Sequence, residues 1–219
     1  MLQSFYNLIF PQFCEDCNSP LSSAYRLYCV DCISSGIVPT ELENWQQDLT
    51  HGNHLDAAYS LLWYDDMVHE CVHALKYSGS IKPVHQLIEA IELPAIDVDA
   101  LIPIPLYHSR QRERGYNQAE VLANALSKKL QISVDSKILY RKQWTSSQTK
   151  LDNHERKVNM EDKFKCSTEV PFRVLLVDDV LTTGATSDSC AQTLKNAGAK
   201  WVGVMTLATP RLIKGEAKG

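Results

Sequence analysis

Apolar residues in this chain of 219 residues follow two patterns that alternate along most of its length. Four short runs are apolar at nearly every position, which is typical of strands buried on both faces; they are 57–64, 100–105, 173–177 and 201–208. The segments around them carry apolar residues at helical spacing and predict helices over 67–77, 84–93, 117–130 and 186–197. Strands that alternate with helices predict an α/β fold, a parallel sheet flanked by helices on both faces.

The composition is that of a soluble globular protein, with 44% hydrophobic and 22% charged residues. The longest apolar runs are far too short to span a bilayer. The first residues lack the basic region and the small-residue cleavage site of a secretion signal. We therefore expect a cytoplasmic protein without a membrane span.

The net charge of −4 conceals a basic middle segment. Residues 1–100 carry a balance of −11, residues 101–165 one of +6 and residues 166–219 one of +1. This local excess of positive charge favours an anionic ligand, and a solvated basic face is the alternative. Trp144 lies near Lys142 in the basic segment, and an aromatic ring among cations is typical of surfaces on which single-stranded DNA stacks. We therefore expect weak binding of single-stranded DNA, without sequence preference, at this segment.

Four of the seven cysteines form two CxxC pairs separated by eleven residues. Each pair aims two thiolates at one point, and two pairs supply the four sulfur ligands of a structural zinc site. Two disulfides are the alternative, but disulfides are rare in a chain without a secretion signal. Because the protein fills all four positions, such an ion has none open for catalysis. The expected zinc ligands are Cys14, Cys17, Cys29 and Cys32. The remaining cysteines are expected to be core thiols; they are Cys71, Cys166 and Cys190.

Composition divides the chain into four parts. Residues 1–38 hold the cysteine pairs and predict an N-terminal zinc-binding module with almost no core of its own. Residues 39–56 are polar and acidic and predict a connector. The alternating strands and helices fill 57–212, which predicts one domain of ordinary size, and 213–219 predicts a tail.

The predicted strand 173–177 leads directly into Asp178 and Asp179 and then into a short loop before a helix. In an open parallel sheet, ligands bind at the carboxyl ends of the strands. Backbone N–H groups, threonine hydroxyls and the positive end of a helix dipole make such a loop a cradle for phosphate. The two carboxylates would accept hydrogen bonds from sugar hydroxyls, so we expect a ribose 5-phosphate site rather than a simple helix cap. Its loop residues are Leu181, Thr182, Thr183, Gly184, Ala185 and Thr186.

This segment resembles the phosphoribosyl pyrophosphate signature of type I phosphoribosyltransferases, in which an apolar strand is followed by Asp-Asp and then Thr-Thr-Gly-Ala-Thr. Residues 101–123 are similar to the strand, basic loop and helix that hold the pyrophosphate arm in these proteins. Guanidinium groups suit phosphate oxygens, and a solvated basic loop is the alternative. The arginines concerned are Arg110, Arg112 and Arg114.

Most of the chain, from Cys14 to about Thr209, resembles the ComF family, also called competence protein F or amidophosphoribosyltransferase-like proteins. The features that carry the resemblance are the four-cysteine module, the sequence LKYSG at 75–79 and a flexible loop with a particular spacing of polar residues. For LKYSG, a simple helix end is the alternative. The loop residues that match are Arg141, Thr145, Gln148, Leu151, Arg156 and Asn159.

The resemblance implies a type I phosphoribosyltransferase-like domain with an N-terminal zinc ribbon, in which Asp178 and Asp179 are the catalytic acids and phosphoribosyl pyrophosphate binds with Mg²⁺. It also implies a role in the internalisation of single-stranded DNA during natural transformation, on the cytoplasmic side of the membrane. Single-stranded DNA, the competence helicase and DNA-processing proteins are the partners that it implies. Two functions remain open: a transformation factor with a ligand-binding phosphoribosyl site, and an active phosphoribosyltransferase of nucleotide salvage with an unidentified acceptor.

Overall fold

The computed structural model describes most of the chain after Trp45 and short pieces before it. The described residues are 13–14, 17–21, 28–29, 31–32, 42, 45–64, 66–73, 76, 82–141, 164–167 and 169–210.

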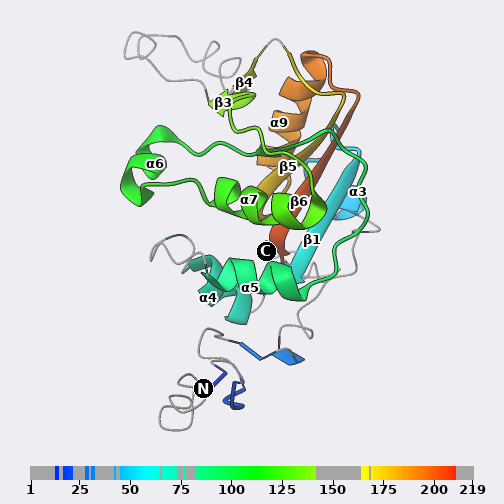
Figure 1. The fold of residues 1–219 in the computed structure, drawn as a ribbon. Coiled ribbons are helices and arrows are strands. Elements are labelled where there is room, and N and C mark those ends of the chain that lie inside the picture. The colour runs from blue at the N-terminus through cyan, green and yellow to red at the C-terminus, as the bar shows by residue number, and fades with distance from the viewer. Residues whose placement is uncertain are drawn as a thin grey trace, which may run out of the picture.

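Four parallel strands form the central sheet, as the apolar runs predict (Figure 1). The strands are β1 (Ala57–Trp63), β2 (Ala100–Pro103), β5 (Arg173–Val180) and β6 (Trp201–Thr209). Their order across the sheet is β1-β6-β5-β2, so the two strands latest in sequence lie in the middle. In this register Asp178 at the end of β5 lies beside Thr206 on β6. Every strand therefore ends at the same edge of the sheet, where the sequence places the acids.

Helices cover both faces of the sheet, which confirms the predicted layers. Helices α4 (Asp66–His73), α5 (Lys82–Ala90) and α7 (Gln118–Leu130) lie on one face, and α9 (Ala185–Asn196) lies on the other (Figure 1). Alternate residues of a strand point to opposite faces. Leu175 and Val177 accordingly belong to the apolar cluster of α4, α5 and α7, whereas Leu176 belongs to the cluster of α9.

Four short elements were not anticipated from the apolar pattern; one of them, helix α3 (Trp45–Asp48), lies before β1. Strands β3 (Leu139–Arg141) and β4 (Phe164–Cys166) pair antiparallel beside the main sheet. The stretch after β2, expected to be a basic loop, contains helix α6 (His108–Arg114), which ends at Gly115 with φ 81°. The sequence of α6 is HSRQRER, so it has no apolar face by which a helix could be detected.

Several residues between Trp45 and Asp56 contact the α9 face of the sheet. Helix α3 (Trp45–Asp48) and the residues after it bury Trp45, Leu49 and Leu55 in the same apolar cluster as α9. The Asp56 carboxylate accepts a hydrogen bond from Val202 N at 2.7 Å and forms an ion pair with Lys195 at 2.9 Å. Polar composition alone did not reveal these three apolar anchors. No helix in the described ranges is both long and apolar enough to cross a membrane.

Candidate functional site

The acids at the end of β5 lead into a turn that is fixed to the neighbouring strand. Asp178 Oδ1 accepts a hydrogen bond from Asp179 N at 2.9 Å. Leu181 N then donates to Ala208 O at 2.9 Å, and Leu181 O accepts from Thr209 Oγ1 at 2.9 Å. Both bonds tie the start of the loop to the carboxyl end of β6, so the loop leaves the sheet at a defined position.

The loop after Leu181 surrounds a small cavity at the beginning of α9. The cavity has a volume of about 50 Å³ and is lined by residues 180–187 together with Asp178, Val204 and Thr206. Helix α9 begins after Gly184 without a side-chain cap, and the threonines 182, 183 and 186 are exposed. Uncapped N–H groups at a helix N-terminus favour an anion, because they donate hydrogen bonds at the positive end of the helix dipole. The geometry suits the phosphate group that the sequence predicts for this loop.

The segment from Leu49 to His54, which we call the brace, contacts this loop, a feature that was not expected from the sequence. His51 N donates to Thr183 O at 3.0 Å. Gly184 has φ +78°, and a Cβ atom there would lie 2.0 Å from His51 O. The sequence offers no signal for this contact, because the brace and the loop lie far apart in the chain. Glycine is therefore required at 184 by the backbone beneath it as well as by the turn.

A second contact fixes the brace to the first turn of α9. His54 N donates to Asp188 Oδ1 at 2.7 Å, and His54 Nδ1 lies 3.1 Å from Asp188 Oδ2. Asp188 is largely buried, with 15% of its side chain exposed. A carboxylate held by two donors cannot turn easily, so the start of α9 is held in place from outside the helix.

Lys76 is the partner of the second acid. Its Nζ lies 2.8 Å from Asp179 Oδ2, and the two side chains are 25% and 17% exposed. Lys76 belongs to the LKYSG sequence, for which a simple helix end was the alternative. The structure therefore brings Lys76 to the site; Tyr77 lies outside the described residues.

The environment of Asp178 favours its protonated form. Burial and the charge of Asp179 raise the pKa of Asp178 to about 7, against the opposing effects of the Asp179 N–H, Lys76 and Arg141. Near neutral pH the two acids thus carry fewer than two negative charges. Such a pair can both accept and donate hydrogen bonds to hydroxyl groups.

Arg141 lies at the end of β3, at the start of the predicted flexible loop. Its Nε donates to Pro105 O at 2.7 Å, and its guanidinium group lies 3.8 Å from the centre of the Tyr107 ring and 4.4 Å from that of Phe164. Arg141 also borders a cavity of about 560 Å³ between the end of β2, the start of α7 and the β3–β4 pair. The other predicted loop residues lie outside the described part of the chain; they are Thr145, Gln148, Leu151, Arg156 and Asn159. The same holds for Lys142 and Trp144.

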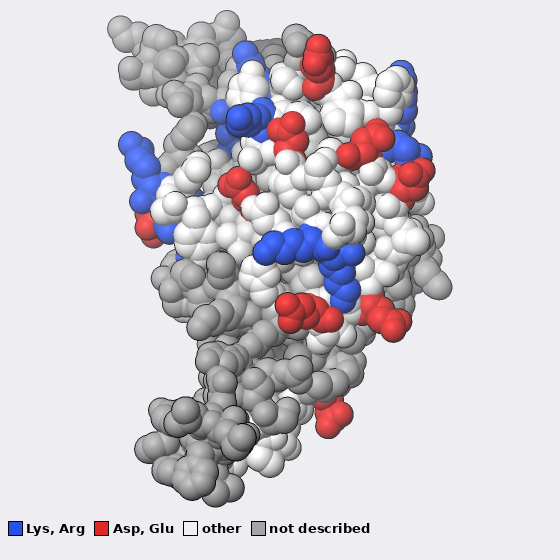
Figure 2. All heavy atoms as spheres, in the orientation of Figure 1, with Lys and Arg blue, Asp and Glu red and all other residues white. Residues whose placement is uncertain are grey.

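The three arginines expected to hold the pyrophosphate arm lie on α6. Arg110 and Arg112 are exposed, whereas Arg114 Nη1 donates to Gln118 Oε1 on α7 at 3.1 Å. Figure 2 shows basic side chains gathered over α6 at the left edge of the view, and mixed charges over the rest of this face. Arg114 thus connects α6 to α7, and Arg110 and Arg112 face solvent.

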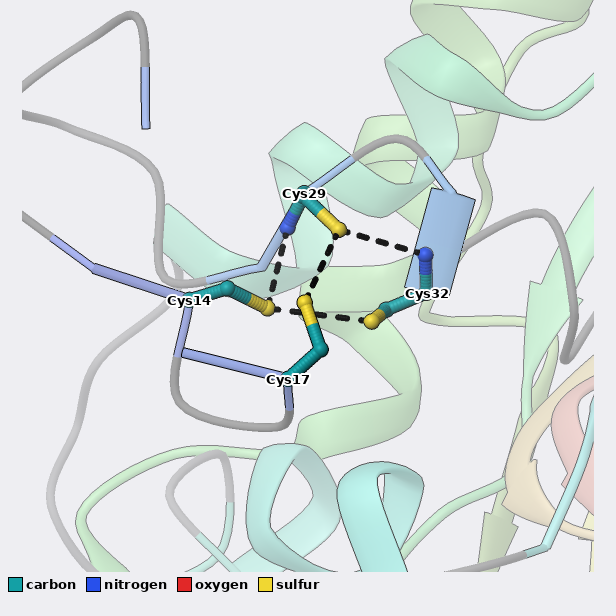
Figure 3. Close-up of side chains that lie close together, drawn as sticks. All are labelled: Cys14, Cys17, Cys29 and Cys32. Atoms are coloured by element: carbon teal, nitrogen blue, oxygen red, sulfur yellow. Dashed lines mark hydrogen bonds between the residues drawn. The ribbon is translucent and has the colours of Figure 1, made fainter. Parts of the chain in front are cut away.

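The four N-terminal cysteines converge on one point (Figure 3). All four sulfur atoms lie within 4.8 Å of one another, with Cys14 to Cys32 at 3.8 Å and Cys17 to Cys29 at 3.6 Å. A tetrahedral zinc ion with sulfurs at about 2.3 Å needs neighbouring sulfurs about 3.8 Å apart. Cys29 N donates to Cys14 Sγ at 3.3 Å, and Cys32 N donates to Cys29 Sγ at 3.4 Å. The cysteine cluster therefore has the donors and the spacing of a metal site.

The thiols differ in acidity between this cluster and the core. Hydrogen bonds from the side chain and backbone of Ser19 lower the pKa of the Cys17 thiol to about 6, which favours the thiolate that binds metals. Cys166 and Cys190 lie away from this cluster, on the α9 side of the sheet, where burial raises the pKa of both thiols. Cys190 is a buried core thiol, as expected, whereas Cys166 is only partly buried; nothing is described of the Cys71 side chain.

The structure defines an α/β protein with a parallel sheet flanked by helices and a four-cysteine cluster at the N-terminus. No family model matches the chain. It is 31% identical over 209 residues to "Competence protein F" of Haemophilus influenzae, a match that covers 90% of this chain and 84% of the relative. The chain belongs to the competence protein F family.

Two further relatives extend this comparison. "Competence protein ComFC" of Streptococcus pneumoniae is 26% identical over 198 residues, covering 89% of this chain and 86% of the relative. "DNA utilization protein YhgH" of Escherichia coli K12 is 32% identical over 146 residues, covering 62% of this chain and 64% of the relative.

Two solved structures are similar at a lower level. Glutamine phosphoribosylpyrophosphate amidotransferase from B. subtilis has a TM-score of 0.38 and 19% identity, covering 60% of this chain and 26% of that chain. Purine phosphoribosyltransferase from Pyrococcus horikoshii has a TM-score of 0.27 and 17% identity, covering 73% of this chain and 82% of that chain. At such TM-scores these likenesses carry no argument about function.

Proposed function

We propose that this protein binds phosphoribosyl pyrophosphate, or a related ribose 5-phosphate ligand, at the carboxyl edge of its sheet. The observation that carries the proposal is the position of Asp178, which lines the same small cavity as the uncapped start of α9. One wall of this cavity offers N–H groups to a phosphate, and the other offers a carboxyl group to sugar hydroxyls. A ligand with both groups fits the two walls at once.

Mg²⁺ is expected to accompany the ligand, because a pyrophosphate arm carries several negative charges that a divalent cation neutralises. Carboxylates are suitable oxygen ligands for this ion, and Asp178 and Asp179 are the acids at this edge of the sheet. We further propose that the cysteine cluster holds one structural zinc ion. Its four sulfur ligands leave no position for water, so the ion would stabilise the N-terminal residues and take no part in chemistry.

In the cell, we propose that the protein supports the uptake of single-stranded DNA during natural transformation, on the cytoplasmic side of the membrane. Relatives named for competence and for DNA utilization support this role. Single-stranded DNA, the competence helicase and DNA-processing proteins are the proposed partners. The basic segment 101–165 supports an anionic partner.

A second candidate function is phosphoribosyl transfer to an acceptor. It is favoured by the cavity of about 560 Å³ beside Arg141, which adjoins the site and has room for a small molecule. In this reaction a nitrogen of the acceptor would form a bond to C1 of the ribose while the bond from C1 to pyrophosphate breaks. Release of pyrophosphate that depends on an added base or amine would identify this activity.

The proposed ligand should stabilise the folded protein, because it binds only the folded state. At a hundredfold excess over Kd, phosphoribosyl pyrophosphate with Mg²⁺ should stabilise it by about 2.7 kcal/mol. That corresponds to a rise in Tm of roughly 5–10 °C for a chain of this size. The double variant Asp178→Ala/Asp179→Ala should remain folded and lose this rise in a thermal-shift assay.

The control is Asp97→Ala, since Asp97 is 97% exposed and precedes β2, at the opposite edge of the sheet. This variant should keep the full rise in Tm. An equal rise in the double variant would place the ribose elsewhere in the protein.

A further inference from the structure

The two adjacent acids face different surroundings. Residues 178 and 179 are consecutive in β5, so their side chains point to opposite faces of the sheet. Asp178 lines the phosphate cavity on the α9 side. Asp179 follows the register of Leu175 and Val177, which face α4, α5 and α7, and it meets Lys76 from the segment after α4. At the carboxyl ends of the strands, Asp178 therefore lies on the α9 side of the sheet and Asp179 on the α4 side.

We propose that Lys76 is a positioning residue for sugar recognition, acting through Asp179. This inference rests on the proposed function, because it names the residue that prepares one acid for the ribose hydroxyls. Lys76 Nζ contacts Asp179 Oδ2 at 2.8 Å. The ammonium group thereby fixes the plane of the carboxylate, whose other oxygen carries lone pairs for a hydroxyl group.

Burial makes this contact more effective than an ion pair at the surface. The two side chains are only 25% and 17% exposed, so water screens their attraction weakly. Without Lys76, the Asp179 carboxylate would lose this contact and the orientation that the contact imposes.

Lys76 also reduces the repulsion between the acids and an anionic ligand. Asp178, Asp179, Lys76 and Arg141 are the charged groups that act on one another at this edge. Arg141 is held by Pro105 O and two aromatic rings on the β3–β4 side, whereas Lys76 approaches from the α4 side. Each cation thus offsets negative charge from a different direction.

The test compares two ligands that share only the phosphate group. Inorganic phosphate probes the loop, and ribose 5-phosphate probes the loop and the acids together; calorimetric titration gives Kd for each. In Lys76→Met, affinity for ribose 5-phosphate should fall roughly tenfold to a hundredfold, as expected when a hydrogen bond to a charged group is lost. Affinity for inorganic phosphate should change less than about twofold, because the loop hydrogen bonds do not involve Lys76. Lys76→Arg should recover part of the loss.

Lys195→Met is the matched control, because Lys195 forms an ion pair with Asp56 at 2.9 Å with similar exposure, 28% and 30%. It should leave both affinities unchanged. Should Lys76→Met not fold, Lys76→Gln takes its place, since it removes the charge and keeps a polar side chain.

Two results would overturn the inference alone: unchanged binding of ribose 5-phosphate in the variant, or equal losses for both ligands, which would indicate a purely structural ion pair. If the wild-type protein bound neither ligand, the proposed function would fail and this inference with it. The wild-type measurements therefore separate the two failures.

Discussion

At the scale of single residues, the site contains two acids that look equivalent in the sequence and differ in the structure. Asp178 is partly buried and lines the small cavity at the start of α9, and Asp179 is paired with Lys76. Burial and the neighbouring negative charge raise the pKa of Asp178 to about 7, whereas an aspartate in an unfolded chain titrates near 3.9. This difference has a consequence for stability.

The contribution of Asp178 to the stability of the folded protein should fall as pH rises from about 4 to 7. In this range the folded state keeps a proton on Asp178 that the unfolded state has released, so raising the pH favours unfolding. Asp178→Asn removes this proton equilibrium and keeps the shape of the protonated acid. Between pH 4.5 and pH 8 the variant should gain roughly 1–3 kcal/mol in free energy of unfolding relative to the wild type.

Urea denaturation at both pH values measures this difference. Asp97→Asn, which changes a carboxylate that is 97% exposed, should follow the wild type throughout. If Asp178→Asn were as pH-dependent as the wild type between these values, the environment inferred for Asp178 would be wrong.

At the scale of elements, the loop 181–186 depends on its contacts with the brace. Gly184→Ala would place a Cβ atom 2.0 Å from His51 O, a contact with backbone that cannot move aside easily. Besides the cost of a left-handed conformation, about 1 kcal/mol, we expect a further loss of about 1–3 kcal/mol from overpacking. Binding of inorganic phosphate should fall as well, because the start of α9 must shift.

Gly115→Ala is a close control, since Gly115 has φ +81° and a Cβ there meets nothing within 4 Å. The difference between the two variants in free energy of unfolding isolates the contact with the brace. Equal losses in both would mean that His51 does not constrain Gly184.

The sequence predicted those elements whose physical signal is local. Apolar runs identified the four strands of the main sheet, and helical spacing identified α4, α5, α7 and α9. The β3–β4 pair and the helices α3 and α6 were missed, because elements of three or four residues are too short to show a pattern and α6 is polar on all sides. The contact of Lys76 with Asp179 and that of His54 with Asp188 join distant parts of the chain, which no local pattern reports.

At the scale of the whole molecule, the cysteine cluster is not independent of the larger domain. Cys14, Tyr28 and Cys32 are buried in the same apolar cluster as the residues of α4, α5 and α7. The sequence predicted a module with almost no core of its own, and this shared cluster provides the packing that such a module lacks. Loss of the metal should therefore lower the stability of the larger domain as well as that of the cysteine cluster.

Purified protein should contain one zinc ion per chain by elemental analysis. Cys29→Ser should lose the metal, because it removes one of four sulfur ligands, and it should lower Tm while the sheet remains folded. Cys166→Ser is the control: Cys166 is partly buried against the α9 face, away from the cluster, and the variant should keep its zinc. Full retention of zinc in Cys29→Ser would remove Cys29 from the set of ligands.

The strand order also determines when the protein can fold during its synthesis. Strands β1 and β2 are made first but lie at opposite edges of the sheet, and β6 and β5, which pair with them, are made last. The nascent chain must therefore hold β2 without its partner until β5, which ends at Val180, has left the ribosome, and β1 without its partner until residues near Thr209 have left it. Unpaired apolar strands tend to associate with other chains, so this protein is exposed to aggregation for most of its translation and depends on the last fifth of its sequence to end that exposure.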